Sequence, residues 1–255
     1  MIWLMTAMKC EGEKISGILG DNMTHIVTGI GPVNASFALR KLIDSGRCAP
    51  FDKILNVGVC GAGDGVPARK LFFINKITDM VSGRDYYPDL ALFPSDIEES
   101  QIITSDNIVS EPDPGRLYDE EAAGIFETGQ KFFSPDSMVF IKIVSDHGKD
   151  IPTKGQVADI IYEKKDIIED AARRLMTRAE EQRLQAEILD LKDILCLTEA
   201  MNNDMNNLLR YAKAQGKLDL VERYISGLSE EGQIPVKNKK EGAIHAGNIR
   251  RILGV

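Results

Sequence analysis

The stretch Lys53-Ile54-Leu55-Asn56-Val57-Gly58-Val59-Cys60-Gly61-Ala62-Gly63 decides the fold class. It is an apolar run that passes directly into a glycine-rich turn, a pattern typical of a buried strand. Helical stretches at Val33 to Asp44 and Glu120 to Phe132 lie between other apolar runs of this kind. These further runs, each ended by Gly, Asp or Ser, are Ile2 to Met5, His25 to Thr28, Leu71 to Ile77, Ile102 to Thr104 and Met138 to Val144. The alternation predicts an α/β fold with a mixed, largely parallel sheet covered by helices.

The pattern changes from about Val157, where strand signals stop and charged segments with helical spacing begin. Apolar residues then recur every three or four positions, first at Leu184, Ile188, Leu191 and Leu195 and later at Leu208, Tyr211, Ala212, Leu218, Val221, Ile225 and Leu228. This spacing predicts two or three further helices. We therefore expect one domain at residues 1–180 and a helical extension at 181–255. The final stretch, 236–255, is rich in Lys and Arg and is expected to be a loose basic tail.

The amino-acid composition limits the classes of partner that we expect for this protein. The 255 residues carry a formal charge of -8, from 31 Lys and Arg against 39 Asp and Glu. This balance gives no overall attraction for nucleic acid or anionic lipid, so a nucleic-acid partner is not expected. No stretch approaches the ~20 apolar residues of a membrane span. The four cysteines are widely separated, without the spacing of a zinc site, and indicate reduced thiols in a cytoplasmic protein.

Polar groups and glycine turns follow several predicted strands, where open α/β sheets place their ligands. Glycines at 29, 31 and 58 can let backbone N–H groups approach a ligand, or can simply shape turns. Asp146 can face a ligand or cap the following turn. Glu121 and Glu11, each taken alone, fit solvated surface carboxylates better than catalytic groups.

Taken together, these segments resemble the nucleoside phosphorylase and methylthioadenosine/adenosylhomocysteine nucleosidase family over residues 1–180. The matching segments, in chain order, are Ala7-Met8-Lys9-Cys10-Glu11, Thr28-Gly29-Ile30-Gly31-Pro32-Val33-Asn34-Ala35, Asn56-Val57-Gly58-Val59-Cys60-Gly61-Ala62, Glu120-Glu121-Ala122 and Ser145-Asp146. The resemblance implies a three-layer α/β/α domain with a mixed central sheet, assembled as a homo-oligomer. It also implies cleavage of the N-glycosidic bond of a purine nucleoside, with a 5'-modified adenosine as one candidate.

The resemblance implies a role for each carboxylate. Asp146 would hold or deliver a proton at purine N7, directly or through Ser145, as the leaving base gathers negative charge. Glu121 would bind the ribose hydroxyls beside the developing oxocarbenium ion. Glu11 would orient and deprotonate the attacking water. Gly29, Gly31 and Gly58 would shape the pocket, and no metal or organic cofactor is implied.

Four positions depart from the family pattern. Asn56 stands where phosphorylases of this type place an Arg, and Val59 where they place a Ser, which favours water over phosphate as the nucleophile. Glu120 replaces the Met that lies under the ribose, and Ile108 stands where an aromatic residue stacks on the purine.

Two alternatives therefore stay open. One is a phosphorylase that uses phosphate as a co-substrate. The other is a catalytically weak nucleoside-binding module whose C-terminal helices dock a protein partner.

Overall fold

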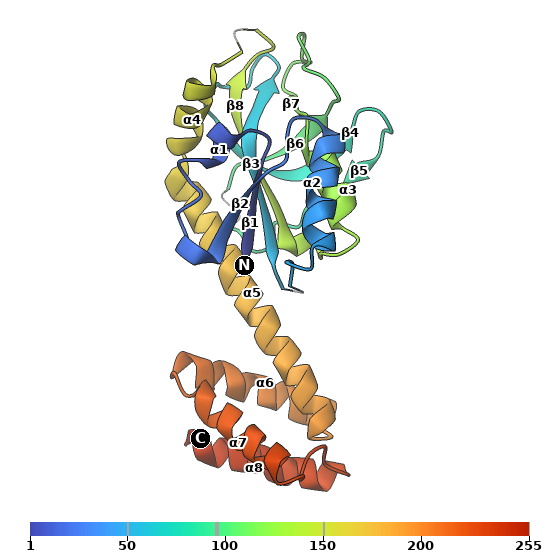
Figure 1. Cartoon of the computed structure of the whole chain (residues 1–255), viewed down its shortest axis with the longest axis vertical. Helices are drawn as coiled ribbons and strands as arrows, with labels where there is room; N and C mark the ends of the chain where they lie inside the picture. Colours follow the sequence, from blue (N-terminus) through green and yellow to red (C-terminus); the bar gives the residue numbers. More distant parts are fainter. Residues whose placement is uncertain (50, 95–96, 150, 255) are drawn as a thin grey trace. The chain divides into compact units, whose positions relative to one another are not determined.

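The computed structural model describes residues 1–49, 51–94, 97–149 and 151–254, and the side chains at 184–190 and 214 lie outside this description. The chain divides into two compact units, Met1–Ala179 and Glu180–Val255. Figure 1 shows the elements of both units, coloured along the sequence from blue to red. No helix in the described part of the chain has both the length and the apolar character needed to cross a bilayer.

Unit 1 is built on one mixed sheet, which in the described residues has eight strands. They are β1 (Ile2–Thr6), β2 (Met23–Val27), β3 (Lys53–Ala62), β4 (Leu71–Asp79), β5 (Asp85–Tyr86), β6 (Glu99–Thr104), β7 (Leu117–Asp119) and β8 (Met138–Asp146). The order is β2-β1-β3-β7-β6-β4-β5, with β8 paired to both β3 and β4. Parallel pairs such as β1–β3 and β3–β8 coexist with antiparallel pairs such as β4–β8 and β3–β7. The predicted mixed sheet is confirmed.

Five of these strands close on themselves. β3 pairs with β8, β8 with β4, β4 with β6, β6 with β7, and β7 again with β3. A closed ring of strands encloses the side chains that point inward and shields them from water. The inward-pointing side chains of β7 and β8, which are not paired to each other, can therefore meet across the ring.

Helices cover both faces of the sheet, which gives the predicted three layers. In Figure 1, α2 (Pro32–Asp44) and α3 (Ala122–Gly129) lie on one side, and α1 (Lys9–Gly12) and α4 (Lys154–Tyr162) lie on the other. Consecutive residues of β3 point to opposite sides. Ile54 packs with Leu39 of α2 in one apolar cluster, and Leu55 packs with Val157 of α4 in the other. The second cluster also includes Ile168 in the first part of α5 (Lys165–Ile194).

A close contact between α2 and α3 fixes the position of two loops near the sheet edge. A Cβ atom on Gly124 would lie only 2.1 Å from the Pro32 carbonyl oxygen, so only glycine allows this approach. Gly31, just before α2, has a φ of 99°. Glu121 immediately precedes α3. The contact therefore holds Gly31 and Glu121 near each other.

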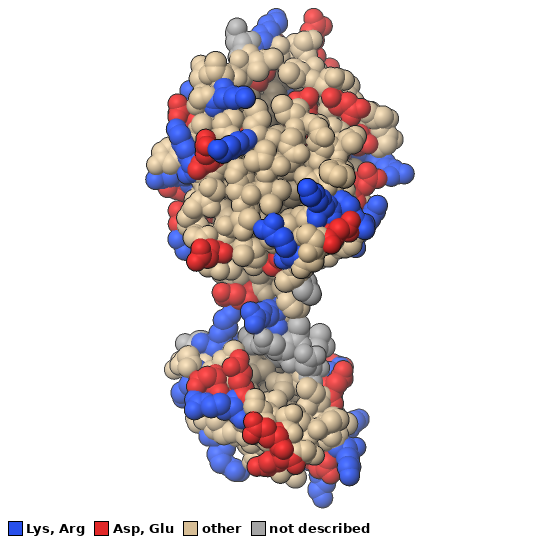
Figure 2. All heavy atoms as spheres, in the orientation of Figure 1, with Lys and Arg blue, Asp and Glu red and all other residues tan. Residues whose placement is uncertain are grey.

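Unit 2 contains the end of α5 together with α6 (Glu199–Ala214), α7 (Leu218–Glu230) and α8 (Lys239–Leu253). Of the first apolar stripe expected from the sequence, Leu191 in α5 and Leu195 just after it are buried, and the side chains of Leu184 and Ile188 lie outside the description. Figure 2 shows side chains of both charge signs, Lys and Arg as well as Asp and Glu, on the visible face of this unit.

The prediction of a loose basic tail at 236–255 is wrong. The Asn238 side chain accepts hydrogen bonds from the backbone N–H groups of Lys240 and Glu241, which caps the start of α8. Ile249 and Leu253 are buried in the core of unit 2. Gly242 of α8 lies against the Leu195 carbonyl, where a Cβ would come within 1.9 Å of the oxygen. The absence of a side chain at Gly242 thus allows α8 to pack closely, and Lys239, Lys240 and Arg251 are exposed on the same helix.

Candidate active site

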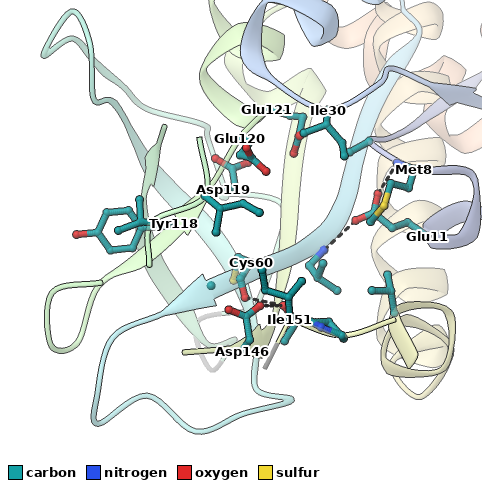
Figure 3. A pocket seen from close by; sticks show the side chains of 18 of the residues that line it. Met8, Glu11, Ile30, Cys60, Tyr118, Asp119, Glu120, Glu121, Asp146 and Ile151 are labelled. Carbon is teal, nitrogen blue, oxygen red and sulfur yellow. Dashed lines mark hydrogen bonds between the residues drawn. The ribbon is translucent and has the colours of Figure 1, made fainter. Parts of the chain in front are cut away.

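A pocket of about 220 Å³ lies where β3, β7 and β8 end and the first strand-to-helix loop begins. Its lining includes eight of the residues singled out from the sequence: Glu11, Ile30, Val59, Ile108, Glu120, Glu121, Ser145 and Asp146. Gly29, Gly31 and Gly58 do not line the pocket, so they can affect its shape only through the residues that do. Figure 3 shows the labelled carboxylates projecting from different elements toward the same space. Segments more than 100 residues apart in the sequence thus meet in one cavity.

Glu11 is fixed by two backbone groups. Its Oε2 accepts a hydrogen bond from the Met8 N–H at 2.8 Å, and its Oε1 accepts one from the Val59 N–H at 3.1 Å. Burial raises the pKa of Glu11 above its ordinary value, while these hydrogen bonds and Lys142 partly offset that effect. A Cβ on Gly58 would lie 3.1 Å from Oε1, so the missing side chain leaves room for the carboxylate. Glu11 is therefore a held, buried group that can accept a proton.

Glu121 is the residue before α3 and is 6% exposed. Its Oε1 accepts a hydrogen bond from the Gly31 N–H at 3.1 Å, so the glycine turn before α2 orients the carboxylate. Burial raises the pKa of Glu121 to about 8, with Asp119 adding to the rise and Lys142 opposing it. A pKa in this range favours the protonated form of Glu121 at neutral pH, and a ligand that brings hydroxyl donors favours the carboxylate.

Ser145 and Asp146 both line the pocket because β8 has an irregular register against β3. Cys60 pairs with Val144, but Gly61 pairs with Asp146, so Ser145 is an extra residue at a bulge. Ser145 Oγ lies 2.7 Å from Asp146 Oδ2 and 3.2 Å from the Cys60 carbonyl oxygen. The other oxygen, Oδ1, accepts a hydrogen bond from the Gly148 N–H at 2.9 Å. This geometry suits a proton relay through the serine hydroxyl.

Lys142 and Asp119 form a buried ion pair that sequence reasoning missed. Lys142 Nζ lies 2.7 Å from Asp119 Oδ2, and the side chains are 1% and 0% exposed. Asp119 also accepts hydrogen bonds from Thr104 Oγ1 and from the Ala122 N–H. Burial acts to lower the pKa of Lys142, but Asp119, Glu121 and Glu11 together raise it. The available signal was a single lysine inside the otherwise apolar run of β8.

Asn56 does not face the pocket. Its Nδ2 donates a hydrogen bond to the Met5 carbonyl, and its Oδ1 is buried without a partner in the described part of the protein. The position where phosphorylases place an arginine is thus occupied by a short amide inside the sheet.

The pocket is strongly acidic. Its charged lining residues, among those the structure describes, are all acidic: Glu11, Asp119, Glu120, Glu121 and Asp146. Apolar side chains such as Ile108 and Ile151, each 59% exposed, border the cavity. Within the described ranges, no three His, Cys, Asp or Glu residues come together in a way that could hold a metal ion.

No protein-family model and no curated protein sequence matches this chain. Solved structures do match. A 5'-methylthioadenosine/S-adenosylhomocysteine nucleosidase from Colwellia psychrerythraea 34H, in complex with adenine, aligns with a TM-score of 0.55 at 16% identity and covers 68% of this chain and 95% of that one. A Borrelia burgdorferi B31 protein solved with adenine gives 0.53 at 17% identity, covering 69% and 99%. A Helicobacter pylori nucleosidase of the same type gives 0.51 at 16% identity, covering 71% and 97%.

These alignments cover nearly the whole of each nucleosidase but only about 70% of this chain. The covered share is close to that of unit 1, which has 179 of the 255 residues. At this level of identity the comparison defines the fold, and the predicted resemblance is confirmed at that level. The chain therefore has the mixed α/β fold of the methylthioadenosine/adenosylhomocysteine nucleosidases, followed by a helical unit.

Proposed function

We propose that unit 1 hydrolyses the N-glycosidic bond of a purine nucleoside. The observation that carries this proposal is the convergence of Glu11, Glu121 and Asp146 on one pocket, each held by backbone hydrogen bonds. Glycosidic cleavage needs separate groups for the nucleophile, the sugar and the leaving base. The solved structures of the same fold are named as nucleosidases, and some contain adenine, which supports a purine ligand.

Each carboxylate has one task in the proposed reaction. Glu11 accepts a proton from water, and the water oxygen forms a bond to C1' of the sugar. The C1'–N9 bond breaks, its electron pair goes to the purine, and Asp146 supplies a proton at N7. Ser145, at 2.7 Å from Asp146, relays or steadies that proton. Glu121 accepts the ribose hydroxyls and, once ionised, stabilises the oxocarbenium character of the transition state.

The charge of the pocket favours water over phosphate as the nucleophile. Phosphate carries negative charge that arginine, lysine, hydroxyls or free backbone N–H groups must meet. Lys142 is buried and paired with Asp119, and the Val59 N–H already donates to Glu11. A phosphate ion would also face Glu11, Glu120 and Asp146 in the lining, where Lys142 offsets only the charge of Asp119. A neutral water molecule meets no such repulsion.

The test is release of free base from adenosine, inosine, methylthioadenosine and adenosylhomocysteine, with and without phosphate. We expect release without phosphate, and loss of at least about a hundredfold in rate for Asp146→Asn. Asp166→Asn, an exposed position at the start of α5, is the matched control and should keep the wild-type rate.

Release only with phosphate would make the protein a phosphorylase. Binding of a nucleoside without any release would make it the binding module that the exposed Ile108 also allows.

A further inference from the structure

Glu120 differs from the other acidic residues of the pocket. Glu11, Asp119, Glu121 and Asp146 each accept a hydrogen bond from a named partner. Glu120, in contrast, has no hydrogen-bond or ion-pair partner among the residues that the structure describes, although it is partly buried. Its carboxylate oxygens are therefore free to accept hydrogen bonds from a ligand.

Its position identifies the part of the ligand that it meets. Figure 3 shows the Glu120 side chain beside that of Glu121 and away from Asp146. In the proposed function Glu121 binds the ribose hydroxyls and Asp146 binds the base. Glu120 thus belongs to the sugar side of the pocket.

The surroundings of Glu120 make it selective. Partial burial and the neighbouring Asp119 both raise the pKa of Glu120, because both disfavour its negative charge. A cation or hydroxyl donor on the ligand relieves this cost by binding the carboxylate. A phosphate or carboxylate on the ligand increases it, since like charges repel.

We propose that Glu120 selects ligands by the charge on their sugar side, so that the pocket takes nucleosides carrying an ammonium or hydroxyl donor there and rejects nucleotides. This inference rests on the proposed function, because it assumes that a nucleoside lies in the pocket with its sugar toward Glu121. It adds a substrate class, nucleosides of neutral or positive charge. It also assigns the residue that excludes phosphorylated ones.

The test measures binding by calorimetry, with carbocyclic adenosine analogues whose sugar ring oxygen is replaced by carbon so that cleavage does not interfere. The panel holds the parent compound, its 5'-amino and 3'-amino forms, and its 5'-phosphate. For wild type at neutral pH and low salt we expect at least one amino form to bind about five- to tenfold more tightly than the parent. The 5'-phosphate should bind at least about tenfold more weakly than the parent.

Glu120→Gln should reduce the amino preference to within about twofold and should strengthen binding of the 5'-phosphate about fivefold or more. Glu222→Gln removes the same charge from an exposed position in α7 and should leave the whole order unchanged. Thermal unfolding of both variants shows that each is folded before binding is measured.

The binding test distinguishes failure of the role of Glu120 from failure of the proposed function. Equal affinities of the wild type for all four compounds, or a charge preference that survives Glu120→Gln, would overturn the role of Glu120 and leave the proposed function standing. Failure of every compound to bind the folded wild type would overturn both.

Discussion

Replacing Lys142 by Met should destabilise unit 1 strongly, because it leaves the Asp119 carboxylate buried and unpaired. The pair joins Nζ and Oδ2 at 2.7 Å, with both side chains shielded from water. Breaking such a buried pair from one side typically costs about 3–5 kcal/mol. Protonation of the orphaned acid limits the loss, and at pH 7 this costs an ordinary aspartic acid about 4 kcal/mol. We therefore expect a loss of about 3–4 kcal/mol at pH 7.

The pH dependence of this loss is a sharper test than its size. Protonating the acid becomes easier by about 1.4 kcal/mol for each pH unit below 7. The deficit of Lys142→Met should therefore shrink toward pH 5, and adding Asp119→Asn should restore part of the stability at pH 7. The assay is urea unfolding followed by fluorescence of Trp3, the only tryptophan of the chain, which is buried in unit 1.

Lys14→Met is the matched control. It removes an ion pair with Asp159 whose Nζ–Oδ1 distance is 2.6 Å but whose side chains are 47% and 64% exposed. We expect it to cost less than about 1 kcal/mol, since water screens exposed pairs. A loss below about 1 kcal/mol for Lys142→Met at pH 7, or one that does not change with pH, would refute the reasoning.

Three further outcomes are expected. Gly58→Ala should slow base release about tenfold with little loss of stability, because the Cβ of the new alanine would lie only 3.1 Å from Glu11 Oε1 and displace the carboxylate. An unchanged rate of base release would argue against Glu11 as the base. Burial raises the pKa of Glu121 to about 8, above its ordinary value of about 4.5. This carboxyl therefore contributes stability that is complete below about pH 4.5 and is lost as pH rises through 8. The free energy of unfolding should fall across this window, and Glu121→Gln should flatten the fall; an equal slope in both proteins would contradict the shifted pKa. Asn238→Ala should cost about 1 kcal/mol in unit 2 through loss of the α8 cap, seen as faster hydrogen exchange in α8 with unchanged exchange in β3.

Much of unit 1 could be predicted from the sequence because its signals are local. The apolar runs at Ile2 to Met5, Leu71 to Ile77 and Met138 to Val144 lie within β1, β4 and β8. The helix expected at Glu120 to Phe132 is shorter, at Ala122–Gly129. Glu121 lies just before its first residue and accepts a hydrogen bond from the Gly31 N–H. The short elements α1, β5 and β7 were missed because two to four residues carry no readable period.

The candidate site divides in the same way. Glu11, Glu121 and Asp146 stood out in the sequence because the segments that hold them, taken together, resemble those of the nucleosidase family. The sequence did not predict that Lys142 pairs with Asp119, nor that Glu120 lacks a partner among the described residues. Both facts depend on which strands close the ring.

By itself the sequence determined the six longer strands of the sheet, the glycine turns and the carboxylates that surround the pocket, because these depend on residues close together in the chain. Only the tertiary structure decided the ring closure through β8, the bulge that turns Ser145 and Asp146 to one side, and the ordered helix α8. These features arise from pairing and packing between segments far apart in the chain. Their stability depends on the space and partners that other segments provide, which no local pattern records.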